Sequence, residues 1–303
     1  MSQVEKPNTL VVLGPTAAGK TRLGVQLAHR LKGEVISADS RQVYRGLDIG
    51  SGKDLGEYVV DGHAIPYHLI DICGLEHEFS VFEYQQRCFA CLEDCWERGV
   101  IPVICGGTGL YLEAVLQGYR MVAAPEDEAL RTELEALDDE ALRARLQALR
   151  PEQHNTTDAI DRARTIRAIE IAEYTLKYPP PPAPDIRPIV LGVQWPREEL
   201  RRRIRQRLES RLDAGMIEEV QGLLEAGISP ERLELLGLEY RFITQYLMGD
   251  IRSRNDLAQK LGAAIAQFAK RQETWFRRME RRGTAIHWVP RGDLDKAWAV
   301  VGG

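Results

Sequence analysis

The sequence predicts an α/β fold: a parallel sheet with helices on both faces, interrupted by an all-helical insert. Three observations predict it. A glycine-rich phosphate-binding pattern links a strand-like segment to a helical one, strand-like and amphipathic segments then alternate, and strand signals vanish between residues 124 and 177. Because residues 188–193 are strand-like again, we expect a core of residues 1–122 and 186–303 with a helical insertion domain over 123–185.

Residues 14–21, Gly-Pro-Thr-Ala-Ala-Gly-Lys-Thr, match the pattern G-x-x-x-x-G-K-[ST]. The preceding run 9–13 is apolar and rich in β-formers, and residues 21–31 have helical spacing. These flanks argue against a chance match in a loop. A strand–loop–helix turn of this kind points backbone N–H groups at an anion, to which Lys20 adds a charge and Thr21 a hydroxyl for Mg²⁺.

The other predicted elements follow the same alternation. Their ranges are strands at 34–37, 68–72, 100–105, 188–193 and 286–289, and helices at 80–98, 200–212 and 255–282, with a loop or lid region at 46–67 and helices from about 124 to 176 in the insert, the last of them beginning near Asp158. Asp39 follows the second strand, and Gly106–Tyr111 forms a second strand-to-helix turn. Ligands of open α/β sheets bind beyond the carboxyl ends of the strands, where both segments lie.

Composition limits the class of protein. The 303 residues carry a net charge of −5, contain no apolar run near the roughly 20 residues of a membrane span, and begin with no apolar signal core, so we expect a cytoplasmic protein without membrane contact. Five cysteines indicate free thiols. Cys88, Cys91 and Cys95 share one helical face, which favours a buried stripe over metal ligands. Arginines crowd residues 197–211 and 270–282, as either a polyanion site or solvated helix faces.

The acid that usually holds Mg²⁺ at the end of a second strand in nucleotide-hydrolysing proteins is not evident after residues 100–105. The best-placed acid is Asp39, close to the phosphate loop. It is better placed to take a proton from an acceptor than to activate water. We therefore expect transfer to an acceptor molecule, either of a phosphoryl group or of the group that the phosphate leaves behind.

Four ordered motifs carry a family resemblance. They are residues 14–21, Asp-Ser-Arg-Gln-Val-Tyr at 39–44, Gly-Gly-Thr-Gly-Leu-Tyr at 106–111, and Lys-Arg-Gln-Glu-Thr-Trp-Phe-Arg at 270–277. Over nearly its whole length the chain resembles the tRNA dimethylallyltransferases (tRNA isopentenyltransferases), of the bacterial type because no C-terminal zinc finger is present. The resemblance implies a phosphate-loop kinase-like core with a helical insert.

The resemblance also implies an activity and partners. A dimethylallyl group would pass from dimethylallyl diphosphate to N6 of the adenosine 3′-adjacent to the anticodon of tRNA, with release of diphosphate. The partners would be Mg²⁺, the donor and the anticodon stem-loop, and we expect a monomer.

The resemblance implies roles residue by residue. Asp39 would accept the N6 proton, while Thr16, Lys20 and Arg207 would act on the diphosphate and Thr21 would hold Mg²⁺. The diphosphate or nucleotide site would comprise Gly14, Pro15, Thr16, Ala17, Ala18, Gly19, Lys20 and Thr21. The tRNA site would comprise Asp39, Ser40, Arg41, Gln42, Thr108, Arg131, Ala163, Arg164, Thr165, Ile166, Arg167, Leu236, Gly237, Leu238, Glu239, Tyr240 and Arg241. Gln42 carries an amide suited to an adenine edge.

Three segments depart from the family pattern. Residues 50–54, Gly-Ser-Gly-Lys-Asp, replace a common Thr-Ala-Lys-Pro run, residues 236–241 lack the usual Gly-Tyr pair, and the insert carries Asn-Thr-Thr-Asp at 155–158 before its arginine-bearing helix. These departures concern the acceptor, not the diphosphate chemistry. The main alternative function is a small-molecule kinase that uses ATP. A non-catalytic RNA-binding module ranks last, since both Asp39 and Lys20 are present.

Overall fold

The computed structural model describes residues 6–149 and 161–302. They divide into two compact units. The larger comprises the described residues up to Gln117 together with those from Pro184 onward, and the smaller comprises the described residues of Gly118–Ala183.

The larger unit is built on a six-stranded sheet in the order β5-β2-β6-β1-β7-β8, in which every neighbouring pair is parallel. The strands are β1 (Thr9–Leu13), β2 (Glu34–Ala38), β5 (Tyr67–His68), β6 (Pro102–Gly106), β7 (Pro188–Gln194) and β8 (Ile286–Pro290). β1 lies between β6 and β7, and all five of its residues are buried. The predicted parallel sheet is confirmed.

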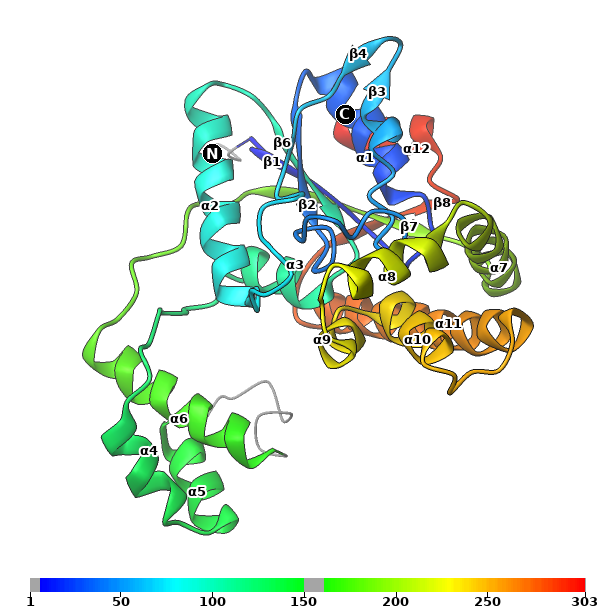
Figure 1. Ribbon diagram of the computed structural model, residues 1–303. Helices are drawn as coiled ribbons and strands as arrows, with labels where there is room; N and C mark the ends of the chain where they lie inside the picture. The colour runs from blue at the N-terminus through cyan, green and yellow to red at the C-terminus, as the bar shows by residue number, and fades with distance from the viewer. Residues whose placement is uncertain (1–5, 150–160, 303) are drawn as a thin grey trace. The chain divides into compact units, whose positions relative to one another are not determined.

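Helices cover both faces of this sheet (Figure 1). The helices of the larger unit are α1 (Lys20–Leu31), α2 (Val81–Glu97), α3 (Gly109–Leu116), α7 (Arg197–Asp213), α8 (Met216–Glu225), α9 (Pro230–Leu235), α10 (Leu238–Leu247), α11 (Arg254–Arg281) and α12 (Leu294–Val301). Apolar residues of α1 and α12 pack on one face, and those of α2, α3 and the end of α11 pack on the other. α12 was not predicted from the sequence.

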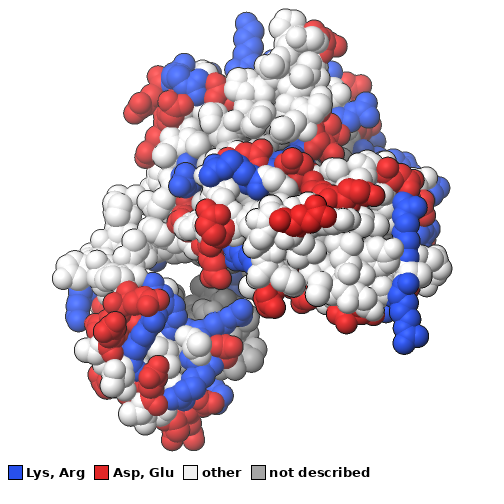
Figure 2. Space-filling view, viewed as in Figure 1, with Lys and Arg blue, Asp and Glu red and all other residues white. Residues whose placement is uncertain are grey.

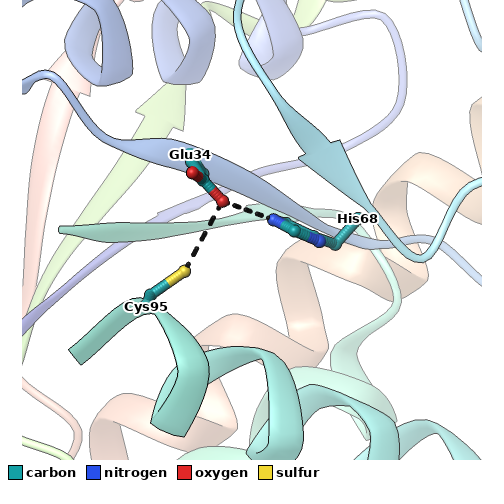
Figure 3. Close-up of side chains that lie close together, drawn as sticks. All are labelled: Glu34, His68 and Cys95. Carbon is teal, nitrogen blue, oxygen red and sulfur yellow. Dashed lines mark hydrogen bonds and ion pairs between the residues drawn. The ribbon is translucent and has the colours of Figure 1, made fainter. Parts of the chain in front are cut away.

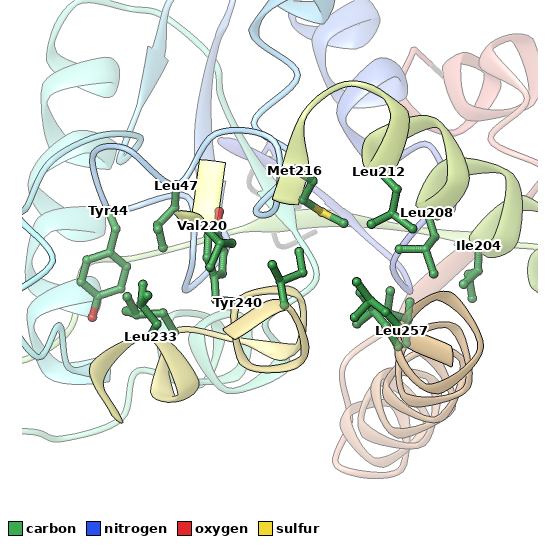
Figure 4. Close-up of a cluster of buried hydrophobic side chains, with 14 of the residues drawn as sticks. Tyr44, Leu47, Ile204, Leu208, Leu212, Met216, Val220, Leu233, Tyr240 and Leu257 are labelled. Carbon is green, nitrogen blue, oxygen red and sulfur yellow. The ribbon is translucent and has the colours of Figure 1, made fainter. Parts of the chain in front are cut away.

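The remaining helices form a layer of their own. α7 to α11 bury an apolar cluster that includes Ile204, Leu208, Leu233, Tyr240 and Leu257, and this cluster extends to Tyr44 and Leu47 in the segment after β2 (Figure 4). The cluster joins the C-terminal helices to the segment that carries Asp39. Parts of the chain that are distant in sequence therefore surround one site.

Two predicted segments differ in the structure. Residues 68–72 were expected to be a strand, but β5 ends at His68 because Leu69 and Asp71 adopt φ of 62° and 56°, which extended backbone does not allow. The expected loop over 46–67 contains a short 3₁₀ helix, η1 (Leu55–Tyr58), and a hairpin of β3 (Val59–Val60) with β4 (His63–Ala64).

The cysteine predictions are confirmed. All five cysteines are free, and on α2 Cys88 and Cys95 are buried while Cys91 is half-buried. Burial raises the pKa of the Cys88 thiol well above its ordinary value, so this side chain stays neutral and belongs to the core.

The smaller unit consists of α4 (Glu128–Glu135), α5 (Asp139–Leu149) and α6 (Arg162–Lys177). They bury Leu134, Leu142, Leu146 and Ile169 in a separate core. The described residues of this unit form no strand. Asp161 caps α6 by accepting a hydrogen bond from the Arg164 N–H, while the predicted start of this helix at Asp158 lies outside the described residues. None of the described helices is long and apolar enough to cross a membrane.

Candidate active site

The phosphate loop connects β1 to α1 at the carboxyl end of the sheet. Ala17 and Gly19 adopt positive φ of 62° and 86°, and at Gly14 a side chain would lie 2.9 Å from the carbonyl oxygen of Val193. The first and last glycines of the motif are therefore required by close packing against β7 and by the turn into α1.

Side chains from distant helices fix this loop. The Thr16 N–H donates to Oε1 of Gln272 at 2.8 Å, and Nε2 of Gln272 donates to the Gly107 carbonyl at 2.8 Å. Arg203 donates from Nε to the Ala17 carbonyl at 2.9 Å, and its guanidinium lies 4.3 Å from the centroid of the Trp195 ring. Arg207 donates to the Thr16 hydroxyl. The loop is held by α7 and α11 as well as by its own strand and helix.

A cavity of about 510 Å³ opens beside the loop. Its lining residues come from the phosphate loop, the segment after β2, the β6–α3 turn, α7, and the region from α9 to α11. The cavity collects these predicted residues: Thr16, Ala17, Gly19, Lys20, Thr21, Asp39, Ser40, Arg41, Gln42, Thr108, Arg207, Gly237, Leu238, Glu239, Tyr240 and Arg241. Gly14, Pro15, Ala18 and Leu236 support this wall from behind and do not line the cavity.

Positive charge is concentrated at the loop end of the cavity. Burial, together with the neighbouring Arg207, lowers the pKa of Lys20 to about 8, although Cys105 and Asp39 act in the opposite direction. Burial and the neighbouring Arg211 likewise lower the pKa of Arg207 to about 10. Burial and like charge thus disfavour the charged forms of both side chains, and an anionic ligand beside them would favour those forms.

Asp39 is oriented by its own turn, because its Oδ1 accepts a hydrogen bond from the Arg41 N–H at 2.8 Å. The next residue, Ser40, donates its N–H to the Thr108 hydroxyl at 3.0 Å, which ties this turn to the β6–α3 segment. The amide of Gln42 is already engaged: its Oε1 accepts from the Ser37 hydroxyl and its Nε2 donates to the Gly52 carbonyl. In this arrangement Gln42 shapes the wall of the cavity.

Two of the three segments that depart from the family pattern, residues 50–54 and 236–241, pack on each other, while the third, residues 155–158, lies outside the described residues. Glu219 of α8 accepts hydrogen bonds from the N–H groups of Asp48, Ile49 and Gly50 and from the hydroxyl of Tyr240. A side chain at Gly50 would lie 2.7 Å from the Tyr240 ring. The tyrosine in one variant segment therefore requires the glycine in the other.

Gly52 has a similar relation to Arg211. The Arg211 guanidinium covers Gly52 so closely that a β-carbon there would lie 1.9 Å from Nη2, and Nη2 donates to Asp54 Oδ2 at 3.2 Å. Arg211 is only 9% exposed and lines the cavity one helical turn beyond Arg207. The sequence places Arg203, Arg207 and Arg211 on one side of a helix. Only the structure shows that Arg203 and Arg211 also line the cavity.

Two further carboxyl groups line the cavity, those of Glu57 and Glu239. Burial raises the pKa of each, while Arg207 and Arg211 act against that shift. Glu57 and the loop-binding Gln272 were not predicted as site residues, because their contacts depend on the tertiary structure.

Comparison with known proteins gives a consistent result. The family model described as IPP transferase matches residues 42–279, and a model described as Isopentenyl transferase matches residues 7–65. The chain is 58% identical to tRNA dimethylallyltransferase 2 of Syntrophotalea carbinolica, over 93% of this chain and 94% of that protein. It is 56% identical to tRNA dimethylallyltransferase 1 of Geotalea uraniireducens, over 95% and 94%. The chain belongs to the tRNA dimethylallyltransferase family.

Solved structures agree with this assignment. The full-length tRNA isopentenylpyrophosphate transferase of Bacillus halodurans aligns with a TM-score of 0.68 and 33% identity, over 96% of this chain and 93% of that one. A eukaryotic dimethylallyltransferase that acts on tRNA aligns with a TM-score of 0.76 over 98% and 77%, and at 22% identity it supports the fold alone. The predicted family and enzyme class are confirmed.

Six residues of the insert were predicted to contact tRNA, and they lie in the smaller unit. Arg131 and Arg167 both pair with the buried carboxylate of Glu170, and Arg167 also donates to the Ala124 and Pro125 carbonyls. Thr165 and Ile166 are buried. Ala163 and Arg164 are exposed, and the Arg164 guanidinium makes no ion pair with another described residue.

On the face of the molecule shown in Figure 2, acidic and basic side chains of the described residues are intermixed over both units. At the end of α11, Arg278 and Arg282 both pair with Glu113, a buried acid on α3. Arg277 and Arg281 of this helix are exposed, and so is Arg271, which lines the cavity.

A second group of polar side chains lies away from the cavity, at the amino end of β2. Glu34, His68 and Cys95 approach one another closely enough to hold a metal ion (Figure 3). However, Arg98 donates to both Glu34 oxygens, at 2.7 and 2.9 Å, and His68 lies 2.7 Å from Oε2. Hydrogen bonds from Arg98 lower the pKa of Glu34 to about 2. This carboxylate already has its cationic partner, so the cluster joins β2, β5 and α2 as an ion-pair network.

The pKa of Lys20 predicts how donor binding depends on pH. Lys20 is protonated below about pH 8 and loses its charge above it, so we expect the Kd of dimethylallyl diphosphate to rise as the pH increases through 8. The measurement is calorimetric titration from pH 6.5 to 9.5. Lys20→Arg keeps the charge over this range, so its Kd should show no rise near pH 8. A rise of equal size in that variant would contradict the assignment.

The contact between Gly52 and Arg211 predicts a coupled pair. Gly52→Ala should displace the Arg211 guanidinium and break its bond to Asp54, costing about 1 kcal/mol beyond the strain of a left-handed alanine. Gly62→Ala is the matched control, since Gly62 also has a positive φ, of 78°, but nothing lies within 4 Å of a side chain there. Denaturant unfolding measures both free energies of unfolding.

The same cycle in an Arg211→Leu background tests the mechanism. There the cost of Gly52→Ala should fall to that of Gly62→Ala. If the extra cost persists without the arginine, the clash is not its cause.

Proposed function

We propose that this chain transfers a dimethylallyl group from dimethylallyl diphosphate to N6 of the adenosine 3′-adjacent to the anticodon of tRNA and releases diphosphate. The observation that carries the proposal is a carboxylate, Asp39, in the same cavity as a fully formed phosphate loop. Family membership supports the substrates, since relatives over half identical are named for this reaction.

Each residue has a chemical task in this proposal. The loop N–H groups with Lys20 and Arg207 bind the diphosphate, and their charge stabilises it as it leaves the allylic carbon. The adenine amine is a weak nucleophile, so its proton must be removed as the new C–N bond forms. Asp39 accepts that proton, and the bond from Arg41 N–H keeps its carboxylate oriented. The adenosine must leave its stack to reach this cavity.

A divalent cation, Mg²⁺, fits the residues at the loop. Thr21 lines the cavity with a hydroxyl group, a hard oxygen ligand of the kind that Mg²⁺ prefers alongside phosphate oxygens. When bound, the ion would neutralise charge on the diphosphate. Arg203, which reaches the loop from α7, supplies charge at the same place.

The residues predicted to contact tRNA fall into two groups, those that line the cavity and those in the smaller unit. Ser40, Arg41, Thr108 and Arg241 line the cavity and can contact the acceptor nucleotide. In the smaller unit, Arg164 is exposed and suited to a phosphate contact, whereas Arg131 and Arg167 hold Glu170 and maintain the unit's own structure. We further propose that the chain acts as a monomer in the cytoplasm.

The alternative, a small-molecule kinase, shares the phosphate loop and the acid. It differs in product: a kinase releases ADP from ATP, and this enzyme releases diphosphate from a prenyl donor. Mass analysis of tRNA nucleosides after incubation with dimethylallyl diphosphate should detect prenylated adenosine. ADP formation with an unmodified tRNA would instead support the kinase.

Asp39→Asn tests the proton acceptor. The amide keeps the oxygen that accepts from the Arg41 N–H but cannot take a proton, so we expect the single-turnover rate of transfer to fall by about 10²- to 10⁴-fold. The Kd of the donor, measured by calorimetry, should change little. A near-normal rate in this variant would exclude Asp39 as the base.

Arg164→Ala tests the smaller unit. We expect weaker tRNA binding, and the slope of log K against log salt should become shallower by about 1 because one phosphate contact is lost. Lys177→Ala is the control, since it removes an exposed cation at the far end of the same helix. Filter binding over 50–300 mM salt measures both slopes. Equal slopes for Arg164→Ala and the parent would remove this residue from the RNA interface.

A further inference from the structure

Two large apolar side chains are exposed at the cavity although neither belongs to a described core cluster. Leu235, the last residue of α9, is 63% exposed, and Phe268 of α11 is 38% exposed. Both line the cavity. Their neighbours in sequence supply the core instead: Leu233 and Leu236 are buried on one side, and Ile265 and Ala269 on the other. The fold therefore does not require these two side chains to be apolar.

Arginines lie close to this apolar surface. The Arg271 guanidinium lies over the Phe268 ring, 5.9 Å from its centroid, and Arg241 lines the same cavity. An aromatic ring with an arginine over it matches unpaired nucleotides, whose bases stack on the ring and whose phosphates pair with the arginines.

The other occupant with matching apolar character is the prenyl chain of the donor. That chain is uncharged, so it gives no reason for cations around the ring. In the proposed function the diphosphate of the donor already has Lys20 and Arg207 as its cationic partners, so it does not need Arg271. The charge pattern therefore favours RNA.

We propose that Phe268, with Leu235, forms a stacking platform at this cavity for an unpaired base next to the adenosine that enters it. The proposal rests on the proposed function, and it specifies how the RNA loop is held. Extrusion of one base leaves its neighbours without a stacking partner on one face. A ring at the cavity would replace that partner and keep the loop open for the reaction.

The kinetic test uses Phe268→Ala, Phe268→Leu and Phe268→Tyr with an anticodon stem-loop as acceptor. We expect Phe268→Ala to raise the KM of the RNA by about tenfold and leave the KM of the donor unchanged. Phe268→Tyr should restore the parent value, whereas Phe268→Leu, which is apolar but has no ring, should not. Met248→Ala is the control, because Met248 is 60% exposed and does not line the cavity.

A binding test without donor separates this proposal from the transfer chemistry. A stem-loop with 2-aminopurine one position 3′ of the target adenosine should lose fluorescence when it binds the parent protein, and lose markedly less with Phe268→Ala at saturation. The result does not depend on whether transfer occurs, so it remains informative if the proposed function fails. Equal quenching by both proteins, or a rise only in the KM of the donor, would overturn the proposal.

Discussion

The site depends on how the phosphate loop is held from outside. A loop of this kind presents N–H groups to an anion only if its backbone is fixed before the ligand arrives. Here Gln272 accepts from the Thr16 N–H, Arg207 donates to the Thr16 hydroxyl and Arg203 donates to the Ala17 carbonyl. The same Gln272 holds Gly107, so the loop and the β6–α3 turn are aligned by one side chain. The phosphate loop and the β6–α3 turn of this chain are brought together in this way.

The charges of the cavity follow from that arrangement. Lys20 and Arg207 are brought close to each other with much of their surface removed from water, and the pKa of each is lowered as a result. Asp39 lies nearby but its Oδ1 is directed to the Arg41 N–H. The pocket therefore combines a cationic region that favours an anion with a carboxylate beside it. Departure of a diphosphate requires the first, and removal of a proton requires the second.

The fold and the main residues of the site could be predicted from the sequence because they depend on local pattern. The phosphate loop, Asp39 after β2 and the helical insert are visible in spacing and composition alone. The strand expected over 68–72 ends at His68, because Leu69 and Asp71 adopt positive φ angles that the local sequence pattern does not indicate. For the same reason the positions of Gln272, Arg211 and Glu219 at the site were invisible: each acts on a loop far away in the chain. Buried roles, such as those of Ile166 and the Arg167–Glu170 pair, also appear only in three dimensions.

The bond between the Thr16 N–H and Gln272 spans 256 positions of the chain. During synthesis on the ribosome the amino-terminal strands emerge first, but Gln272 emerges only when nearly the whole chain has been made. A nascent or truncated polypeptide that ends before α11 would therefore lack this bond to the phosphate loop, although α7 would still supply Arg203 and Arg207. The loop reaches its final set of contacts only late in the synthesis of the protein.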